Sequence, residues 1–243
     1  MPFNNLDNLS PKTIGNEVLE QEIELLVSKV PIAEYQVILR NENALDKLYS
    51  IVVKDAGLSA VFIKIASSAF TTPVHNTKDL RRAIIKLGAV QVVNMITIIT
   101  LRQLSSNGSG YVVSTKLLTL ATEAAIALNA IEKKPESFLT GLALFGGAMI
   151  AAAYAEHLEL DVDLYDCLAL NNELLPFFLT HWSFSENITN TIKCHLDSLD
   201  ANISLALNAV AVNNDMNYIS GCETNISLYA IKEVIAKIGS FQL

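Results

Sequence analysis

The sequence predicts an all-α fold, and three observations lead to this prediction. Hydrophobic residues make up 51% of the 243-residue chain and charged residues only 17%, which is the composition of a packed globular protein. Apolar residues recur at helical spacing, as in Ala44–Lys54, where Leu48 and Val52 lie on one face. The sequence contains no Gly-rich strand–turn–helix unit and no internal repeat. We therefore expect one compact domain of many helices.

Capping residues and helix breakers set the predicted boundaries. Pro31 ends a first helix because proline has no amide hydrogen to donate. Asn43 and Asp46 have the spacing of a capping box, and Thr77 is expected to cap a helix whose first turn favours Asp79. Pro176 and Trp182-Ser-Phe mark turns. The predicted helices are Glu17–Lys29, Ala44–Lys54, Leu58–Phe70, Leu80–Leu87, Ala89–Leu104, Val112–Ile131, Ser137–Ala155, Glu186–His195, Ser204–Val212 and Ile226–Ile238.

The secondary structure or location of three segments does not follow from apolar periodicity alone. Ala89–Leu104 is rich in β-branched residues, which favour strands, but its length and its neighbours indicate a helix. Phe138–Ala155 is about long enough to span a bilayer. Its Ala and Gly content and its polar-faced neighbours instead favour a buried central helix without membrane insertion. Ser105–Gly110, with the sequence SSNGSG, is predicted to be a loop.

Charge and cysteine content exclude several classes of function. The net charge of −8 argues against sequence-independent nucleic-acid binding through a broad basic surface. Cys167, Cys194 and Cys222 are widely spaced and odd in number, so neither a zinc site nor a disulfide framework is predicted. The N-terminus lacks a basic region followed by an apolar one, so no signal peptide is expected. We expect a cytoplasmic protein with free thiols.

Four short motifs in the first half follow one another in a characteristic order. Asp55-Ala-Gly-Leu58 precedes Ala66-Ser-Ser-Ala69, a turn with Pro73-Val74 comes next, and Arg82-Ala-Ile-Ile-Lys-Leu-Gly88 completes the series. This order resembles the HDOD domain, the HD-related output domain of bacterial signalling proteins. That family has an Asp-Pro-x-Leu element, an Ala-Asn-Ser-Ala run, a proline turn and a helix that ends at Leu-Gly.

The second half continues the resemblance. Trp182-Ser-Phe-Ser-Glu186 resembles the family's Trp-Gly-x-Pro-Glu turn, and Ile192-Lys-Cys-His195 resembles its Ile-x-x-His-His ending. The resemblance covers residues 15–240 and implies an HD-like helical domain there, preceded by an N-terminal extension of residues 1–14.

The most informative departure lies in Gly141–Gly147. This segment aligns with the Gly-Leu-Leu-His-Asp-Ile-Gly of less degenerate relatives, so Leu144 and Phe145 replace the His-Asp doublet. In catalytic HD hydrolases the doublet binds one or two metals that activate water. Leu and Phe have no donor atom for a metal. The resemblance therefore implies a protein without a metal, cofactor or enzymatic activity. Ser67 replaces the asparagine of the family's Ala-Asn-Ser-Ala run, which weakens or reroutes hydrogen bonds made there.

The histidines and serines lack the sequence context of a catalytic site. Ser67 and Ser68 lack the G-x-S-x-G context of a nucleophile, so capping or packing is expected. His195 with Asp197 would be a remnant ligand pair, but the histidines lack metal-site spacing. A structural role is expected for all four, namely His75, His157, His181 and His195.

Arg81, Arg82 and Lys86 form a basic group on the polar side of Leu80–Leu87. They are interpreted either as a solvated face or as an anchor for an acidic partner or a nucleotide phosphate.

Two hypotheses about function follow. The first is a non-catalytic signalling or scaffold module that binds a protein partner in trans through an apolar patch with a polar rim. The alternative is a degenerate HD-type phosphohydrolase or nucleotide-binding protein. Direct DNA binding would give strongly salt-dependent affinity, and the acidic balance argues against it. The sequence leaves the partner, a nucleotide ligand and the oligomeric state open.

Overall fold

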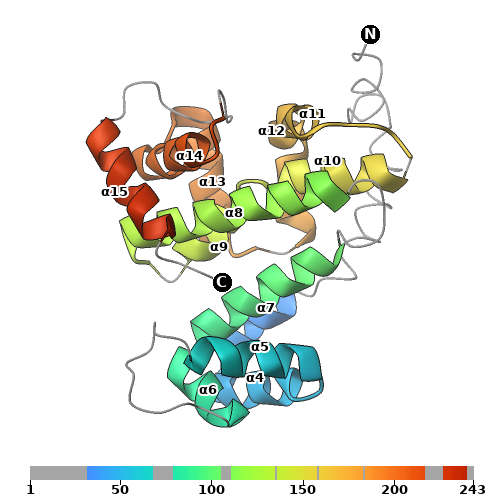
Figure 1. The fold of residues 1–243 in the computed structure, drawn as a ribbon, viewed down its shortest axis with the longest axis vertical. Coiled ribbons are helices and arrows are strands. Elements are labelled where there is room, and N and C mark those ends of the chain that lie inside the picture. Colours follow the sequence, from blue (N-terminus) through green and yellow to red (C-terminus); the bar gives the residue numbers. More distant parts are fainter. Residues whose placement is uncertain are drawn as a thin grey trace. The chain divides into compact units, whose positions relative to one another are not determined.

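The structure is a computed structural model that describes residues 32–67, 79–104, 111–134, 136–157, 159–182, 184–216 and 227–239. All regular elements in these residues are helices (Figure 1), which confirms the predicted all-α class. The chain divides into two compact units. We call Pro31–Thr100 the small unit, and Met1–Val30 with Leu101–Gln242 the large unit. The predicted boundary between residues 14 and 15 lies outside the described residues, and the extent 15–240 stays a prediction.

Helices of the small unit enclose a core of their own. The core is aliphatic and aromatic, and it consists of Tyr35, Leu48, Val52, Phe62, Ile84, Val92, Val93, Met95 and Ile96. Both α4 and α5 pack against α6. The helices, in order, are α3 (Ile32–Leu39), α4 (Ala44–Val52), α5 (Ala56–Ser67), α6 (Leu80–Leu87) and the greater part of α7 (Ala89–Leu104).

Two predicted caps of the small unit are wrong. Asn43 makes no side-chain capping bond to α4, and Asp46 instead accepts a hydrogen bond from Arg81 of α6 at 2.7 Å. Local spacing assigned the Asp46 carboxylate to a capping box. In the structure it binds Arg81, which lies 35 residues away along the chain. At α6 the cap is Asp79 rather than Thr77, because the Asp79 carboxylate accepts the backbone amides of Arg81 and Arg82.

The large unit is organised around its longest described helix. Helix α8 has 22 residues and packs against α9, α10, α14 and α15 (Figure 1). Helix α10 also packs along α12. The helices are α8 (Tyr111–Glu132), α9 (Ser137–Ala143), α10 (Gly146–His157), α11 (Leu164–Ala169), α12 (Asn171–His181), α13 (Glu186–Ser198), α14 (Ala201–Asn213) and α15 (Leu228–Gly239).

The structure corrects two predictions in the large unit. The expected central helix Ser137–Ala155 is two helices, because the chain turns at Leu144 and Phe145 and the two segments are bent by 40°. The expected turn at Pro176 is wrong, since Pro176 lies inside α12. Pro176 cannot donate a backbone hydrogen bond, which costs stability. Burial of the neighbouring Leu175 and Phe178 side chains stabilises the helix and offsets this cost.

The apolar pair α9–α10 forms part of the core of the large unit. Within the described ranges, no single helix is long and apolar enough to cross a membrane, although this bent pair passes that test together. All seven residues of α9 are buried, and α10 is largely buried as well. The predicted buried position of this segment is therefore confirmed.

Glycines allow the helices of the large unit to approach one another closely. A Cβ at Gly147 would collide with the Asn171 carbonyl oxygen and would lie 2.7 Å from the Leu175 backbone nitrogen. A Cβ at Gly141 would lie 2.5 Å from Ala125 Cα of α8. Backbone atoms cannot move aside as a flexible side chain can. These glycines therefore set the spacing of α10 from α12 and of α9 from α8.

We predict that Gly147→Ala destabilises the large unit because the added methyl group meets backbone on α12. Overpacking of this kind costs about 1–3 kcal/mol. Chemical denaturation followed by circular dichroism measures the change. The matched control is Gly57→Ala in α5, where the nearest atom is a side-chain oxygen of Asp55 at 3.2 Å. We expect the control to change stability by less than about 1 kcal/mol. Equal losses in the two variants would contradict the close-approach explanation.

Candidate functional site

The resemblance assigns the junction between α9 and α10 to the missing His-Asp doublet. Leu144 is 5% exposed and Phe145 is 1% exposed, so both side chains belong to the core. The turn that they form is held by Asn171, the first residue of α12. Asn171 donates from Nδ2 to the Leu144 carbonyl at 2.9 Å, and its Oδ1 accepts the Ala148 amide at 2.9 Å. One buried amide thus satisfies the backbone on both sides of the break.

The donor set at this junction does not fit a metal ion. Leu144 and Phe145 offer carbon atoms only, and both polar atoms of the Asn171 amide bind backbone groups. Throughout the described ranges, no group of three His, Cys, Asp or Glu side chains is placed to hold a metal. We therefore derive no metal-dependent step at this position.

Sequence reasoning missed Asn171. The residue has no motif around it, and it lies 27 residues from Leu144, so local spacing gives no sign of the contact. The polar run Asn171-Asn172-Glu173, which interrupts the apolar residues of Cys167–Leu175, was the one available hint. Only the packing of α12 against α10 places it beside the turn.

We predict that Asn171→Leu destabilises the chain because it leaves the Leu144 carbonyl and the Ala148 amide buried without their partner. Each buried unsatisfied polar group costs about 1–3 kcal/mol. Thermal unfolding by differential scanning calorimetry would show the loss. Asn190→Leu is the matched control, because Asn190 is exposed on α13 and its substitution should fall within about 0.5 kcal/mol. A fully stable N171L variant would show that the junction does not need the bridge.

The Trp182 motif forms the connection between α12 and α13. Trp182 is 3% exposed and follows the last residue of α12, and Ser185 caps α13 by accepting the Ile188 amide at 3.4 Å. The Phe178 ring lies 4.3 Å from the Trp182 ring and 5.4 Å from the Phe184 ring, measured between centroids. The tryptophan is thus a packing residue of an aromatic cluster, and the predicted turn is confirmed.

The remaining catalytic candidates are spread over several helices or lie outside the described residues. His195 is 1% exposed on α13, in the core of the large unit. Ser67 ends α5, whereas Ser68 and His75 lie outside the described residues. His157 and His181 are the last residues of α10 and α12. A nucleophile with its base is therefore not found among the described side chains.

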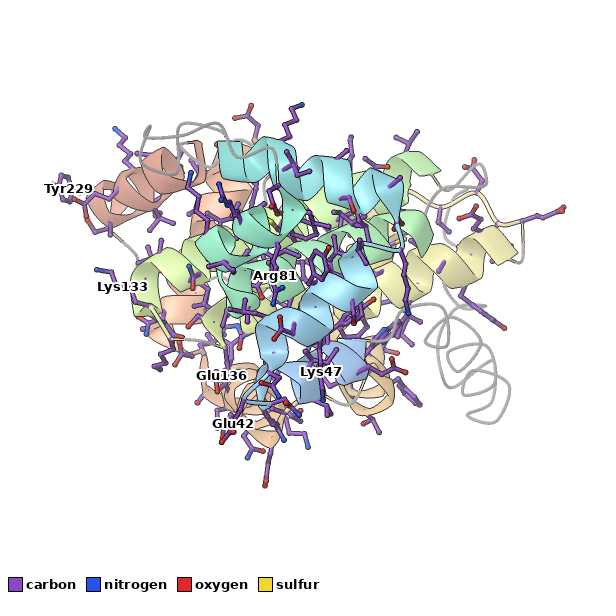
Figure 2. The ribbon with its side chains drawn as sticks, turned by 90° about the horizontal axis from the view of Figure 1, so that it is seen from below. Glu42, Lys47, Arg81, Lys133, Glu136 and Tyr229 are labelled. Carbon is purple, nitrogen blue, oxygen red and sulfur yellow. The ribbon has the colours of Figure 1, made fainter. Side chains whose placement is uncertain are left out.

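The basic group on α6 is partly occupied within the small unit. Arg81 Nη2 binds Asp46 Oδ1 of α4 at 2.7 Å, and its guanidinium lies 5.9 Å from the centre of the Tyr49 ring. Figure 2 shows Arg81 beside α4. Arg82 and Lys86 are exposed on the same helix. All three residues are exposed, and Arg81 is bound to Asp46 of α4.

The described part of the large unit has surface grooves, of which two are considered. The first, of about 480 Å³, is mainly apolar and is lined by residues of α8, the start of α11 with the segment before it, and the segment after α14, among them Val112 and Tyr165. The second, of about 460 Å³, is polar and lies between the start of α9 and α13. Its lining includes Glu136, which Figure 2 labels, and Cys194. Sequence reasoning identified neither groove.

The two described cysteines differ in their environment. Burial raises the pKa of the Cys167 thiol to about 12, and the neighbouring carboxylates of Asp166 and Asp163 act in the same direction. Cys194 is exposed on α13. The thiolate is the reactive form of cysteine, so Cys167 is expected to be inert.

We predict that iodoacetamide at pH 8 alkylates Cys194 and leaves Cys167 unmodified in the folded protein. At that pH a thiol with a pKa of about 12 is almost entirely protonated and is also out of reach of the reagent. Peptide mapping by mass spectrometry separates the sites, and labelling in denaturant is the control. Equal labelling rates for the two thiols in the folded chain would refute this prediction.

Comparison with known proteins agrees with the geometry. Residues 29–149 match the family model of the HDOD domain. Residues 29–149 belong to the HDOD family, and this match, which spans about half of the chain, confirms the resemblance seen in the motifs of the first half.

A solved structure supports the fold over a larger part of the chain. It is a protein from Shewanella amazonensis SB2B named "Putative metal-dependent phosphohydrolase", and it superposes with a TM-score of 0.57. The superposition covers 86% of this chain and 89% of that one, with 18% sequence identity. At this identity the likeness concerns the fold alone. None of the curated proteins matches the chain.

Proposed function

We propose that this chain is a non-catalytic module of bacterial signal transduction, or a scaffold, that acts in the cytoplasm by binding a protein partner in trans. The observation that carries the proposal is the burial of Leu144 and Phe145 at the position of the His-Asp doublet. The HDOD match over residues 29–149 supports the same conclusion. No metal or cofactor is part of the proposal.

The chemistry of phosphoester hydrolysis explains why this observation matters. HD-type hydrolysis needs metal-bound water, and the metal needs imidazole and carboxylate ligands. At the α9–α10 junction the side chains are apolar and packed, and Asn171 binds the backbone. Restoring ligands there would require two charged or polar groups in the core. Burial of such groups without partners is costly.

The alternative is a degenerate phosphohydrolase or nucleotide-binding protein, and metal analysis with an activity assay decides between the two. We expect the purified chain to carry less than stoichiometric transition metal by mass spectrometry and to leave bis(p-nitrophenyl) phosphate unhydrolysed with added Mn²⁺ or Zn²⁺. The reason is the absence of donor atoms at Leu144 and Phe145. His195→Ala is the informative variant.

A tightly bound stoichiometric metal, together with phosphodiesterase activity that His195→Ala removes, would refute the non-catalytic proposal. Partner binding is tested separately by crosslinking and affinity capture from an extract of the source cell. Capture of one protein in reproducible proportion to the bait supports a partner in trans. Failure to capture any protein under crosslinking would count against the scaffold function.

A further inference from the structure

Basic and acidic residues are distributed unequally between the two units. The small unit, Pro31–Thr100, carries eight Lys or Arg and five Asp or Glu residues, a net charge of +3. The other residues carry nine basic and twenty acidic residues, a net charge of −11, which together give the −8 of the whole chain. Such an asymmetry between parts of a chain indicates different binding preferences. The small unit is the part suited to an acidic ligand.

Helix α6 presents a particular surface in this basic unit. Ala83 and Ile84 face the core, with exposures of 0% and 1%. Arg82, Ile85 and Lys86 are exposed, and their spacing of three and four residues places them on one side of the helix. We call these three residues the α6 face.

Ile85 is the apolar member of the α6 face. It is 58% exposed and lies between two cationic residues in a short helix that Asp79 caps. Protein interfaces commonly combine an apolar centre with a polar rim. The α6 face has the same arrangement on a surface of three residues, with Ile85 as the apolar centre and Arg82 and Lys86 as the polar rim.

Arg81, the residue before Arg82, has its partners within the small unit. Arg81 is bound to Asp46 and lies over the Tyr49 ring, so it fastens α6 to α4. Within the described residues, no carboxylate lies within ion-pair distance of the Arg82 side chain. The Arg82 guanidinium is therefore the cation of the α6 face that is open to an external carboxylate.

We propose that the α6 face is the docking site for an acidic segment of the protein partner, in which carboxylates flank an apolar side chain. Arg82 binds carboxylates through its forked guanidinium, Lys86 adds a second positive charge, and the apolar side chain covers Ile85. This inference rests on the proposed function and adds the chemistry of the partner. Nucleic acid fits less well, because its phosphate backbone offers nothing apolar to Ile85, and the rest of the chain repels it.

Fluorescence anisotropy with a defined probe tests the proposal. The probe is a labelled synthetic peptide in which pairs of glutamates flank single leucines, and the titrant is the full chain at low and at high salt. We expect saturable binding that weakens as salt rises, because exposed charges are screened. Arg82→Glu/Lys86→Glu should weaken binding roughly tenfold or more, and Ile85→Ser should weaken it several-fold with an unchanged salt dependence.

The control variant is Lys193→Glu/Lys232→Glu, which makes the same change in net charge at exposed positions on α13 and α15. It should keep nearly full affinity for the peptide. Circular dichroism checks that each variant is folded, and Arg82→Ala serves as a milder variant if the double reversal fails to fold. Absence of peptide binding, or an equal loss in the control, overturns the proposal.

Two further outcomes would identify a different occupant and would also overturn it. Tighter binding of a single-stranded oligonucleotide than of the peptide would assign the α6 face to nucleic acid. Self-association in sedimentation velocity that Arg82→Glu/Lys86→Glu abolishes would assign it to a second copy of the chain. The metal and activity measurements do not involve the α6 face. They therefore test the proposed non-catalytic function independently of the peptide-binding experiment.

Discussion

The close approach of α10 to α12 is the constraint on which the large unit depends. Gly147 brings the α10 backbone against the α12 backbone at Asn171 and Leu175, where no Cβ would fit. That distance allows one short amide side chain to reach both the Leu144 carbonyl and the Ala148 amide. The backbone groups at the break between α9 and α10 therefore have hydrogen-bond partners inside the core. Without such a bridge, a buried break would leave backbone groups unpaired.

This constraint also connects the fold with the absence of catalytic ligands. A turn between two buried helices is a place where polar ligands could converge on a metal. Here the turn residues are Leu144 and Phe145, and the polar side chain that reaches the turn binds the backbone instead. The junction is consequently a packing element.

The small unit shows how one helix can serve both stability and binding. Asp79 caps α6, Arg81 fastens it to α4, and Ile84 anchors it in the core. These contacts use only part of the helix. The opposite side carries Ile85 with its basic neighbours, and nothing in the core requires an exposed isoleucine there. Because these contacts lie on the inner side of α6, the outer side can specify a ligand without disturbing them.

The sequence by itself determined the helical class, most helix positions and the apolar character of Leu144 and Phe145, because apolar periodicity and residue chemistry are local properties. It located Leu80–Leu87 and Ala89–Leu104 with their ends as the structure has them. The tertiary structure alone decided that Asp46 binds Arg81, that Pro176 continues a helix, and that Asn171 holds the turn at Leu144. Each of these depends on residues distant in the chain, and their packing free energy outweighs the local preference on which the sequence prediction relied.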